Sequence, residues 1–259
     1  MIKLKEDKPI NFSHDIFQRG DTICFSQISN EVNSYLYLRK LKDEGIFVNI
    51  LDMKSYSTYS IATNRIYSIE NEKDRESDYC IFTILYFIFI INKLFGSNHN
   101  DLSLNNILMT NKEVLFSTYN KVSYNVGGKK YLFQLPKTVP IIIDFEFMQK
   151  FTYPRVLNYD VVTEAYEAIC VRDTRGMSDV FQYLTSMKMV GFRWRDLFEY
   201  FFHDVSGEDV EMNYQNRIKE ERLGSKVRRV LDEKSFENLF GRYESEIMVD
   251  DVFEHMKFE

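Results

Sequence analysis

The fold is decided by one stretch of the sequence, His99-Asn100-Asp101-Leu102-Ser103-Leu104-Asn105-Asn106-Ile107-Leu108. It contains a His-x-Asp pair, then an asparagine, then apolar residues. A second acidic stretch, Ile141-Ile142-Ile143-Asp144-Phe145-Glu146, lies further along the chain. Its three isoleucines predict a buried strand with Asp144 at its exit. Taken singly, Asp101 fits a capped loop, Asn106 a turn and Asp144 a strand end. Their order and context together indicate a functional site.

A buried helix is predicted immediately before the first stretch. The run Cys80–Ile91 is the most apolar in the chain, Ser77 or Asp78 can cap its start, and Gly96 can end it. The run is shorter than the ~20 residues that span a bilayer, so we expect a central core helix and no membrane span.

Strands are predicted after the first stretch. Gly127-Gly128 lies between two strand-like runs, which indicates a hairpin because such turns need positive φ. The expected strands cover residues 107–109, 114–116, 122–126, 129–133 and 141–143.

The rest of the chain divides into a small N-terminal and a larger C-terminal part. Helices are predicted for residues 25–41, 194–202, 213–231 and 235–239, with another opening at 178–184, and strands for 1–5, 46–51 and 56–69. The charged stretch 70–78 marks the border, which gives expected domains of residues 1–72 and 73–259 in an α+β fold.

Composition excludes several classes of protein. The 259 residues are 44% hydrophobic, enough for a packed core, and the net charge of −6 argues against nucleic acid as a partner. The cysteines, Cys24, Cys80 and Cys170, are far apart and predict reduced buried thiols, with neither a disulfide framework nor a zinc site. Together with the absence of a signal-peptide pattern at Met1, they lead us to expect an intracellular protein.

The two acidic stretches resemble the catalytic loop and the Asp-Phe-Gly-type metal-binding loop of the protein-kinase superfamily. The segment between them, with Gly127-Gly128 and Tyr131, is similar to that of haspin-like kinases and serine/threonine kinases of large DNA viruses. His99–Leu102 and Asp144–Glu146 are also similar to choline/ethanolamine and aminoglycoside kinases. The resemblance covers residues 75–180. It implies a bilobal kinase-like fold and ATP- and Mg²⁺-dependent transfer to a hydroxyl group.

The resemblance also implies a role for each polar residue. Asp101 is the candidate base, or the orienting group, for the acceptor hydroxyl. Asn106 and Asp144 complete the catalytic set as the candidate Mg²⁺ ligands, with the oxygen atoms that this hard ion prefers. His99 is expected to brace the loop. Asp179 is expected to hold the loop backbone, although a helix N-terminal aspartate is the simpler alternative.

The nucleotide-binding half of the site rests on Lys3 and Glu31. The resemblance implies that Lys3 contacts the ATP phosphates and that Glu31 pairs with it. The alternatives are a terminal surface lysine and a solvated helix glutamate. No Gly-rich loop fits before Lys3. Three explanations stay open: a fragment or misplaced start, nucleotide binding without that loop, or a pseudokinase.

Two further departures concern regulation. Glu146 replaces the glycine of the Asp-Phe-Gly pattern, and Asn100 replaces the arginine that usually precedes the catalytic aspartate. We therefore expect no control by activation-loop phosphorylation, because the usual partner of the phosphate is missing.

Three functions are consistent with these residues. The first is an atypical serine/threonine protein kinase with a protein substrate, favoured by the long insert before Asp144. The second is a small-molecule kinase, favoured by Glu146, in which Trp194, Tyr200 and Phe201 either line an acceptor pocket or pack in the core. The third is a pseudokinase scaffold, favoured by the missing Gly-rich loop.

Overall fold

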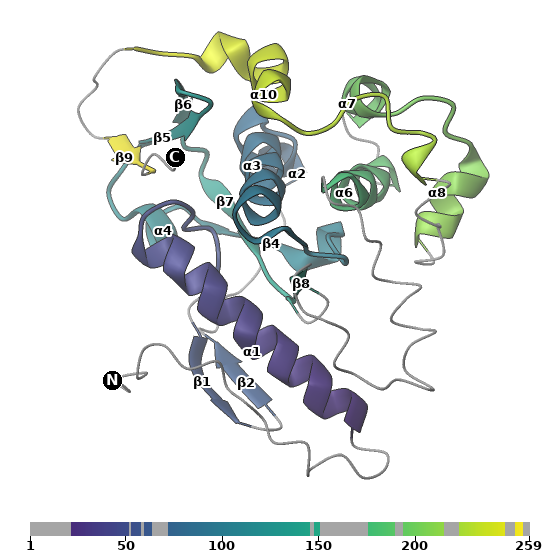
Figure 1. Ribbon diagram of the computed structural model, residues 1–259. Coiled ribbons are helices and arrows are strands. Elements are labelled where there is room, and N and C mark those ends of the chain that lie inside the picture. The colour runs from purple at the N-terminus through teal and green to yellow at the C-terminus, as the bar shows by residue number, and fades with distance from the viewer. Residues whose placement is uncertain are drawn as a thin grey trace.

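The computed structural model describes residues 22–51, 53–57, 60–63, 72–145, 148–150, 176–189, 194–214, 223–246 and 252–255. The fold mixes helices with small sheets, which confirms the α+β class (Figure 1). Its helices are α1 (Thr22–Asp43), α2 (Glu72–Arg75), α3 (Asp78–Phe95), η2 (Leu104–Asn106), α4 (Glu113–Phe116), α6 (Met177–Met189), α7 (Trp194–Phe201), α8 (Gly207–Tyr214), α10 (Glu233–Phe240) and η3 (Gly241–Tyr243). Its strands are β1 (Met53–Ser57), β2 (Ser60–Thr63), β3 (Ser97–Asn98), β4 (Ile107–Asn111), β5 (Lys121–Val126), β6 (Lys129–Gln134), β7 (Thr138–Ile142), β8 (Gln149–Lys150) and β9 (Val252–Glu254).

Helix α3 is the centre of the fold, and its predicted ends are confirmed. The Ser77 side chain accepts a hydrogen bond from the backbone N–H of Cys80, so Ser77 is the N-cap. At the other end Gly96 adopts a left-handed conformation with φ 56°, and its N–H donates to the Asn92 carbonyl. A capped helix of 18 residues therefore leads directly into the stretch that begins at His99.

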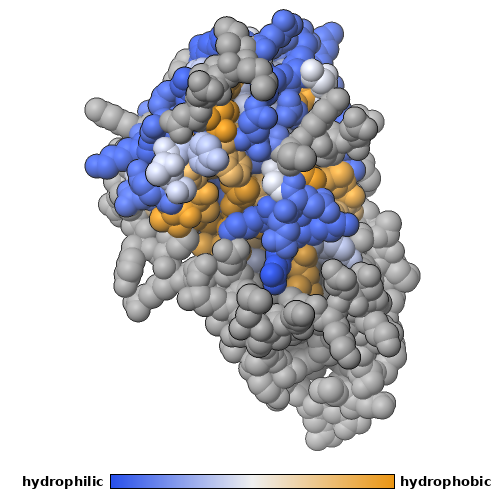
Figure 2. Space-filling model, turned by 90° about the vertical axis from the view of Figure 1, so that its left-hand side faces the viewer, coloured by the Kyte–Doolittle hydropathy of each residue, from blue (hydrophilic) through white to orange (hydrophobic). Residues whose placement is uncertain are grey.

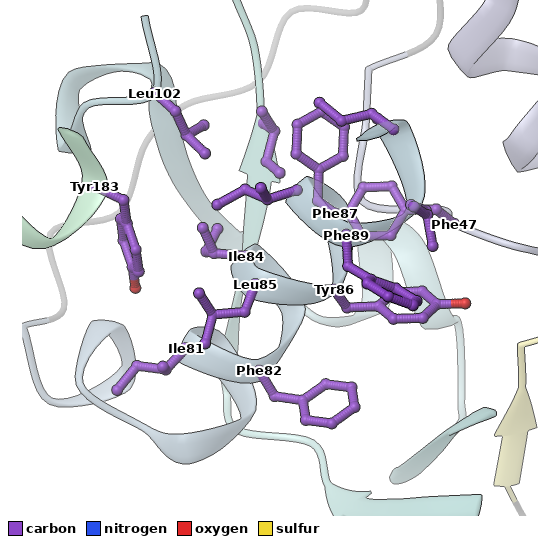
Figure 3. Close-up of a cluster of buried hydrophobic side chains, with 14 of the residues drawn as sticks. Phe47, Ile81, Phe82, Ile84, Leu85, Tyr86, Phe87, Phe89, Leu102 and Tyr183 are labelled. Atoms are coloured by element: carbon purple, nitrogen blue, oxygen red, sulfur yellow. The ribbon is translucent and has the colours of Figure 1, made fainter. Parts of the chain in front are cut away.

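The side chains of α3 are buried on all sides. Every residue from Tyr79 to Ile91 is buried, which fits a run without a polar face. Figure 3 shows Phe47, Leu102 and Tyr183 around this helix, each from a different segment of the chain. Complete burial of one such side chain contributes about 1.5–3 kcal/mol, so α3 organises the core energetically as well as in space.

Two further properties of α3 follow from this burial. By length and composition it could cross a membrane, but 72% of that window is buried inside the fold, as expected for a core helix. Cys80 is a free buried thiol, and burial raises its pKa to about 12. The burial predicted for this thiol is therefore confirmed.

Helix α1 is longer than predicted, and the segment after it differs from the prediction. The chain leaves the helix at Gly45, which has φ 68°. Residues 46–51 are buried but form no strand; Ile50 makes only an isolated bridge to Ile142. Apolar residues in this segment do not alternate, so an irregular chain buries them as well as a strand would. Hydrogen bonds tie the segment to β7, since the Asn49 side-chain amide donates to the Pro140 carbonyl at 2.8 Å and the Asn49 carbonyl accepts the Ile142 N–H at 2.9 Å.

Two antiparallel ribbons follow the first stretch. Strand β4 pairs with β7, and β5 pairs with β6 through the predicted turn, where Gly127 and Gly128 have φ 58° and 78°. The predicted strand at 114–116 is wrong, because these residues lie in the short helix α4.

The surface face at the left of Figure 1 mixes apolar and polar areas (Figure 2). Among the described side chains, the exposed large apolar ones are Leu94, Val114 and Tyr119.

The structure of the C-terminal region differs from the prediction in one helix and contains one additional strand. Of the helix predicted for 213–231, the described residues 213–214 and 223–224 are helical, but residues 225–231 are not. Instead the backbone N–H groups of Arg228 and Arg229 bond to the Phe201 carbonyl at the end of α7. Strand β9, which we did not predict, pairs in parallel with β5. It gives the hairpin a third strand.

Helix α1 and helix α3 contribute to a single hydrophobic cluster. Tyr35 and Leu38 of α1 belong to the same cluster as Phe87 of α3 and Phe181 of α6. The division at residues 72 and 73 stays a prediction, and the cluster is continuous across it.

Candidate functional site

The pairing of β4 with β7 brings the two predicted metal ligands to one end of a ribbon. Ile107 lies opposite Ile142, and the Ile143 N–H donates to the Asn106 carbonyl at 3.0 Å. Asn106 therefore directly precedes one strand, while Asp144 follows its partner closely. Their proximity results from strand register, although they are far apart in sequence.

Asn106 also closes the loop onto Asp101. Its Nδ2 group donates to the Asp101 carbonyl oxygen and to Asp101 Oδ2, both at 2.8 Å. Because Nδ2 faces two acceptors, the hydrogen-bond network assigns the remaining amide atom of Asn106 as Oδ1. This oxygen is left as the atom of Asn106 that can ligate a cation.

Asp179 holds the backbone at the start of the loop. It is fully buried in the first turn of α6, and its two carboxylate oxygens accept hydrogen bonds from the backbone N–H groups of His99 and Asn100, at 2.6 and 2.8 Å. Asn100 has a positive φ of 66°, a conformation that non-glycine residues rarely adopt. Two charge-assisted bonds offset that strain. The predicted loop-holding role of Asp179 is thereby confirmed.

Two more residues of α6 contact the loop, and sequence reasoning missed both. Gln182 Oε1 accepts from the Leu102 N–H at 2.8 Å, and Gln182 Nε2 donates to Asp101 Oδ1 at 3.1 Å. Ser186 Oγ accepts from the Leu104 N–H at 3.2 Å. Residues 179, 182 and 186 are spaced by three and four, so they share one helix face. That spacing of longer polar side chains, on a helix that also carries Val180, Phe181 and Leu184, was the signal available in the sequence.

His99 braces the loop as predicted. Its Nδ1 atom accepts the Asp101 N–H at 3.3 Å, so the proton of the neutral ring lies on Nε2, which donates to the Ile143 carbonyl at 3.0 Å. Burial lowers the pKa of His99 to about 4. A neutral ring therefore connects the Asp101 stretch to the Asp144 stretch.

Phe145 fixes the position of Asp144 through aromatic packing. The fully buried Phe145 ring lies 5.3 Å from the His99 ring and 5.0 Å from the Tyr35 ring, in an edge-on arrangement with Tyr35. Asp144 itself has a φ of 65°. Because the next side chain is locked in the core, the strained backbone at Asp144 is held in one conformation.

The electrostatics place negative charge around this site. Burial raises the pKa of Asp101, the Asp144 charge adds to that effect, and hydrogen bonds from Asn106 and Gln182 oppose it. Burial also raises the pKa of Tyr35, helped by the charges of Glu31 and Asp144. Glu31 lies one turn before Tyr35 on α1, so the predicted helix glutamate and Asp144 act on the same hydroxyl group.

The donor set fits a hard divalent cation such as Mg²⁺. Asn106 offers an amide oxygen and Asp144 a carboxylate, and a Mg²⁺ site typically takes one or two protein oxygens together with water and phosphate. In the described part of the chain, no group of three or more His, Cys, Asp or Glu side chains is arranged to hold a metal. The candidate site is thus a two-residue oxygen pair at the end of a ribbon.

Several predicted residues lie elsewhere or fall outside the described ranges. Lys3 and Glu146 are not among the described residues. Phe201 is fully buried, and the Tyr200 hydroxyl accepts from Asn238 while its ring lies 4.6 Å from the Arg229 guanidinium carbon. These contacts favour packing over an acceptor pocket for both aromatic residues.

Comparison of this chain with family models, with curated proteins and with solved structures finds no match.

Proposed function

We propose that this protein is an ATP- and Mg²⁺-dependent phosphotransferase with a kinase-like bilobal arrangement. The observation that carries the proposal is the hydrogen-bonded loop itself. Asp179 holds its start, and Asn106 closes its end onto Asp101. The ribbon then brings Asp144 beside Asn106. An orienting carboxylate and an oxygen pair for the metal are the groups that phosphoryl transfer needs from a protein.

Each residue has a defined task in this proposal. Asn106 Oδ1 and the Asp144 carboxylate would hold Mg²⁺, which neutralises phosphate charge when bound. Asp101 accepts the hydrogen bond of the incoming hydroxyl and directs its oxygen toward the phosphorus. Burial raises the pKa of Asp101, so its carboxylate is a stronger proton acceptor than an exposed aspartate. Lys3 and Glu31 complete the nucleotide site in the proposal.

A protein serine or threonine is the acceptor we propose. The support is the insert between the two acidic stretches, which forms the β5–β6 hairpin. The hairpin packs on α3, where the ring of Phe133 lies 4.7 Å from the ring of Phe82. The hairpin is therefore an integral part of the fold. A small hydroxylated acceptor such as choline or an aminoglycoside is the outcome of the test that would redirect the proposal.

The experiment measures the melting temperature with millimolar MgATP, with ATP plus EDTA, and without nucleotide. A ligand that binds only the folded state raises the melting temperature. We expect a metal-dependent rise that Asp144→Asn abolishes. Asparagine is the better replacement here because, unlike alanine, it tolerates the positive φ at this position. Asp232→Asn, at the N-cap of α10, controls for a general effect of removing a carboxylate.

Transfer is then measured with radiolabelled ATP and casein, histone, choline or an aminoglycoside. Asp101→Asn should keep the metal-dependent rise in melting temperature and reduce transfer to a small residual rate. If wild-type protein shows no rise at millimolar MgATP, the proposed function is wrong.

A further inference from the structure

We propose that Gln182 is a positioning residue that fixes the direction of the Asp101 carboxylate for the reaction. This inference rests on the proposed function, since it assigns a second residue to the same step. Gln182 lies on α6, 81 residues from Asp101 in the sequence. Its position in the fold is set by the same helix that carries Asp179.

Only one orientation of the Gln182 side-chain amide satisfies both the Leu102 N–H and the Asp101 carboxylate. The Leu102 N–H is a donor, so the atom facing it at 2.8 Å must be the amide oxygen. The amide nitrogen is then directed at Asp101 Oδ1, where it donates at 3.1 Å. The backbone of the loop thus orients Gln182, and Gln182 in turn orients the carboxylate.

Two amides hold the two oxygens of Asp101 separately. Asn106 donates to Oδ2 and Gln182 donates to Oδ1. The terminal torsion of an aspartate is broad, so one hydrogen bond alone leaves the carboxylate free to swing about the bonded oxygen. A second donor fixes its plane. Each carboxylate oxygen still has a further lone pair, which leaves an acceptor position for the substrate hydroxyl.

The proposed role predicts a loss in turnover with little change in ATP binding. Small misplacement of a catalytic group costs up to about 100-fold in rate, and the ATP-binding groups of the proposal are other residues. We expect kcat to fall about 10- to 100-fold in variants that lose the Gln182 donor. The KM for ATP should stay within about threefold, because uniform binding energy is not removed.

Gln182→Glu separates the two contacts of this side chain. A glutamate keeps an acceptor for the Leu102 N–H but places a second carboxylate oxygen against Asp101. Gln182→Met removes both contacts while keeping the side-chain length. Ser186→Ala is the control, because it removes a bond from the same helix to the same loop, at Leu104, without touching Asp101. Ser186→Ala should lower kcat far less than Gln182→Glu does.

A double-mutant cycle distinguishes positioning from general support of the fold. In an Asp101→Ala background no carboxylate remains to be oriented, so Gln182→Met should reduce the residual transfer rate no further. If the rate losses of the two single substitutions multiply in the double variant instead, Gln182 acts independently of Asp101 and the inference is overturned. It is also overturned if Gln182→Glu and Gln182→Met, both folded by circular dichroism, keep wild-type kcat.

The outcome for the wild-type protein separates this inference from the proposed function. If wild type transfers phosphate and the Gln182 variants do too, the proposed function stands and the positioning role fails. If wild type neither binds MgATP nor transfers phosphate, both fail together.

Discussion

Asp179 and His99 are 80 residues apart in the sequence, and the buried Asp179 carboxylate accepts the His99 N–H at 2.6 Å. The same carboxylate accepts the Asn100 N–H. A charged group without access to water is stable only when such donors surround it. This contact therefore ties the position of the loop to the position of α6.

Removal of the Asp179 carboxylate should be strongly destabilising. Asp179→Ala leaves the N–H groups of His99 and Asn100 buried without an acceptor, at about 1–3 kcal/mol each. We expect a loss of roughly 2–6 kcal/mol in the free energy of unfolding, measured by urea denaturation. Asp196→Ala, in the first turn of α7 with an exposed side chain, should change it by about 0.5 kcal/mol or less. Equal effects of the two substitutions would contradict the role of the buried contact.

Acid should destabilise the protein through two buried histidines. Burial lowers the pKa of His99 to about 4 and that of His255 to about 3. Both lie below the unfolded value of about 6.5, so the unfolded state binds protons first as the pH falls. Their contribution is fully present above about pH 6.5 and is lost as the pH drops toward the folded values. Lowering the pH from 7.5 to 5 should reduce the free energy of unfolding by about 2 kcal/mol for each ring.

His255→Phe tests this pH dependence at one ring. The His255 ring stacks on the Tyr124 ring at 4.1 Å, and phenylalanine keeps an aromatic ring there but takes up no proton. We expect urea denaturation of His255→Phe to show a smaller loss of stability between pH 7.5 and pH 5. An unchanged slope in His255→Phe would rule out His255 as a source of the acid effect.

The two glycines of the hairpin should differ in their tolerance of alanine. Both have positive φ, which costs roughly 1–2 kcal/mol with a Cβ present. At Gly127 an added Cβ would also lie 2.9 Å from the Cβ and Cγ atoms of Glu233 on α10, whereas at Gly128 no atom lies within 4 Å. Gly127→Ala should therefore lower the melting temperature more than Gly128→Ala. Equal melting temperatures would mean that α10 moves away without cost.

Phe145 should affect MgATP binding beyond its effect on stability. Phe145→Leu shrinks a fully buried ring between Tyr35 and His99, next to Asp144. Phe116→Leu shrinks an almost fully buried ring that packs 5.2 Å from Phe253 instead. Both should lose about 1–2 kcal/mol of stability. Only Phe145→Leu should weaken the MgATP-dependent rise in melting temperature, and a matching loss in Phe116→Leu would count against a link between Phe145 and Asp144.

The sequence by itself determined the local parts of this fold. Ser77 and Gly96 end α3 through hydrogen bonds to neighbouring residues, and Gly127-Gly128 turns the hairpin through its own backbone preference. Ile141 and Ile142 of the apolar run before Asp144 lie in β7, and Ile143 follows the end of that strand. These features depend on groups a few residues apart, so the pattern contains the interaction that produces them.

Where the secondary structure predicted from the sequence was wrong, contacts with distant residues determined the conformation. Residues 225–231 have a composition suitable for a helix, but Arg228 and Arg229 donate backbone hydrogen bonds to Phe201 at the end of α7. Strand β9 exists only because the edge of β5 is available to pair with it. Intrinsic helix preferences are a few tenths of a kcal/mol per residue, and tertiary hydrogen bonds and burial readily exceed them.

The candidate site divides in the same way. The sequence identified Asp101, Asn106 and Asp144 by their order, and it predicted the role of Asp179. Only the tertiary structure placed Gln182 on Asp101 and gave Phe145 its packing between α1 and the loop. The physical reason is that side-chain hydrogen bonds and ring contacts between distant segments depend on helix packing and strand register, which no local spacing records.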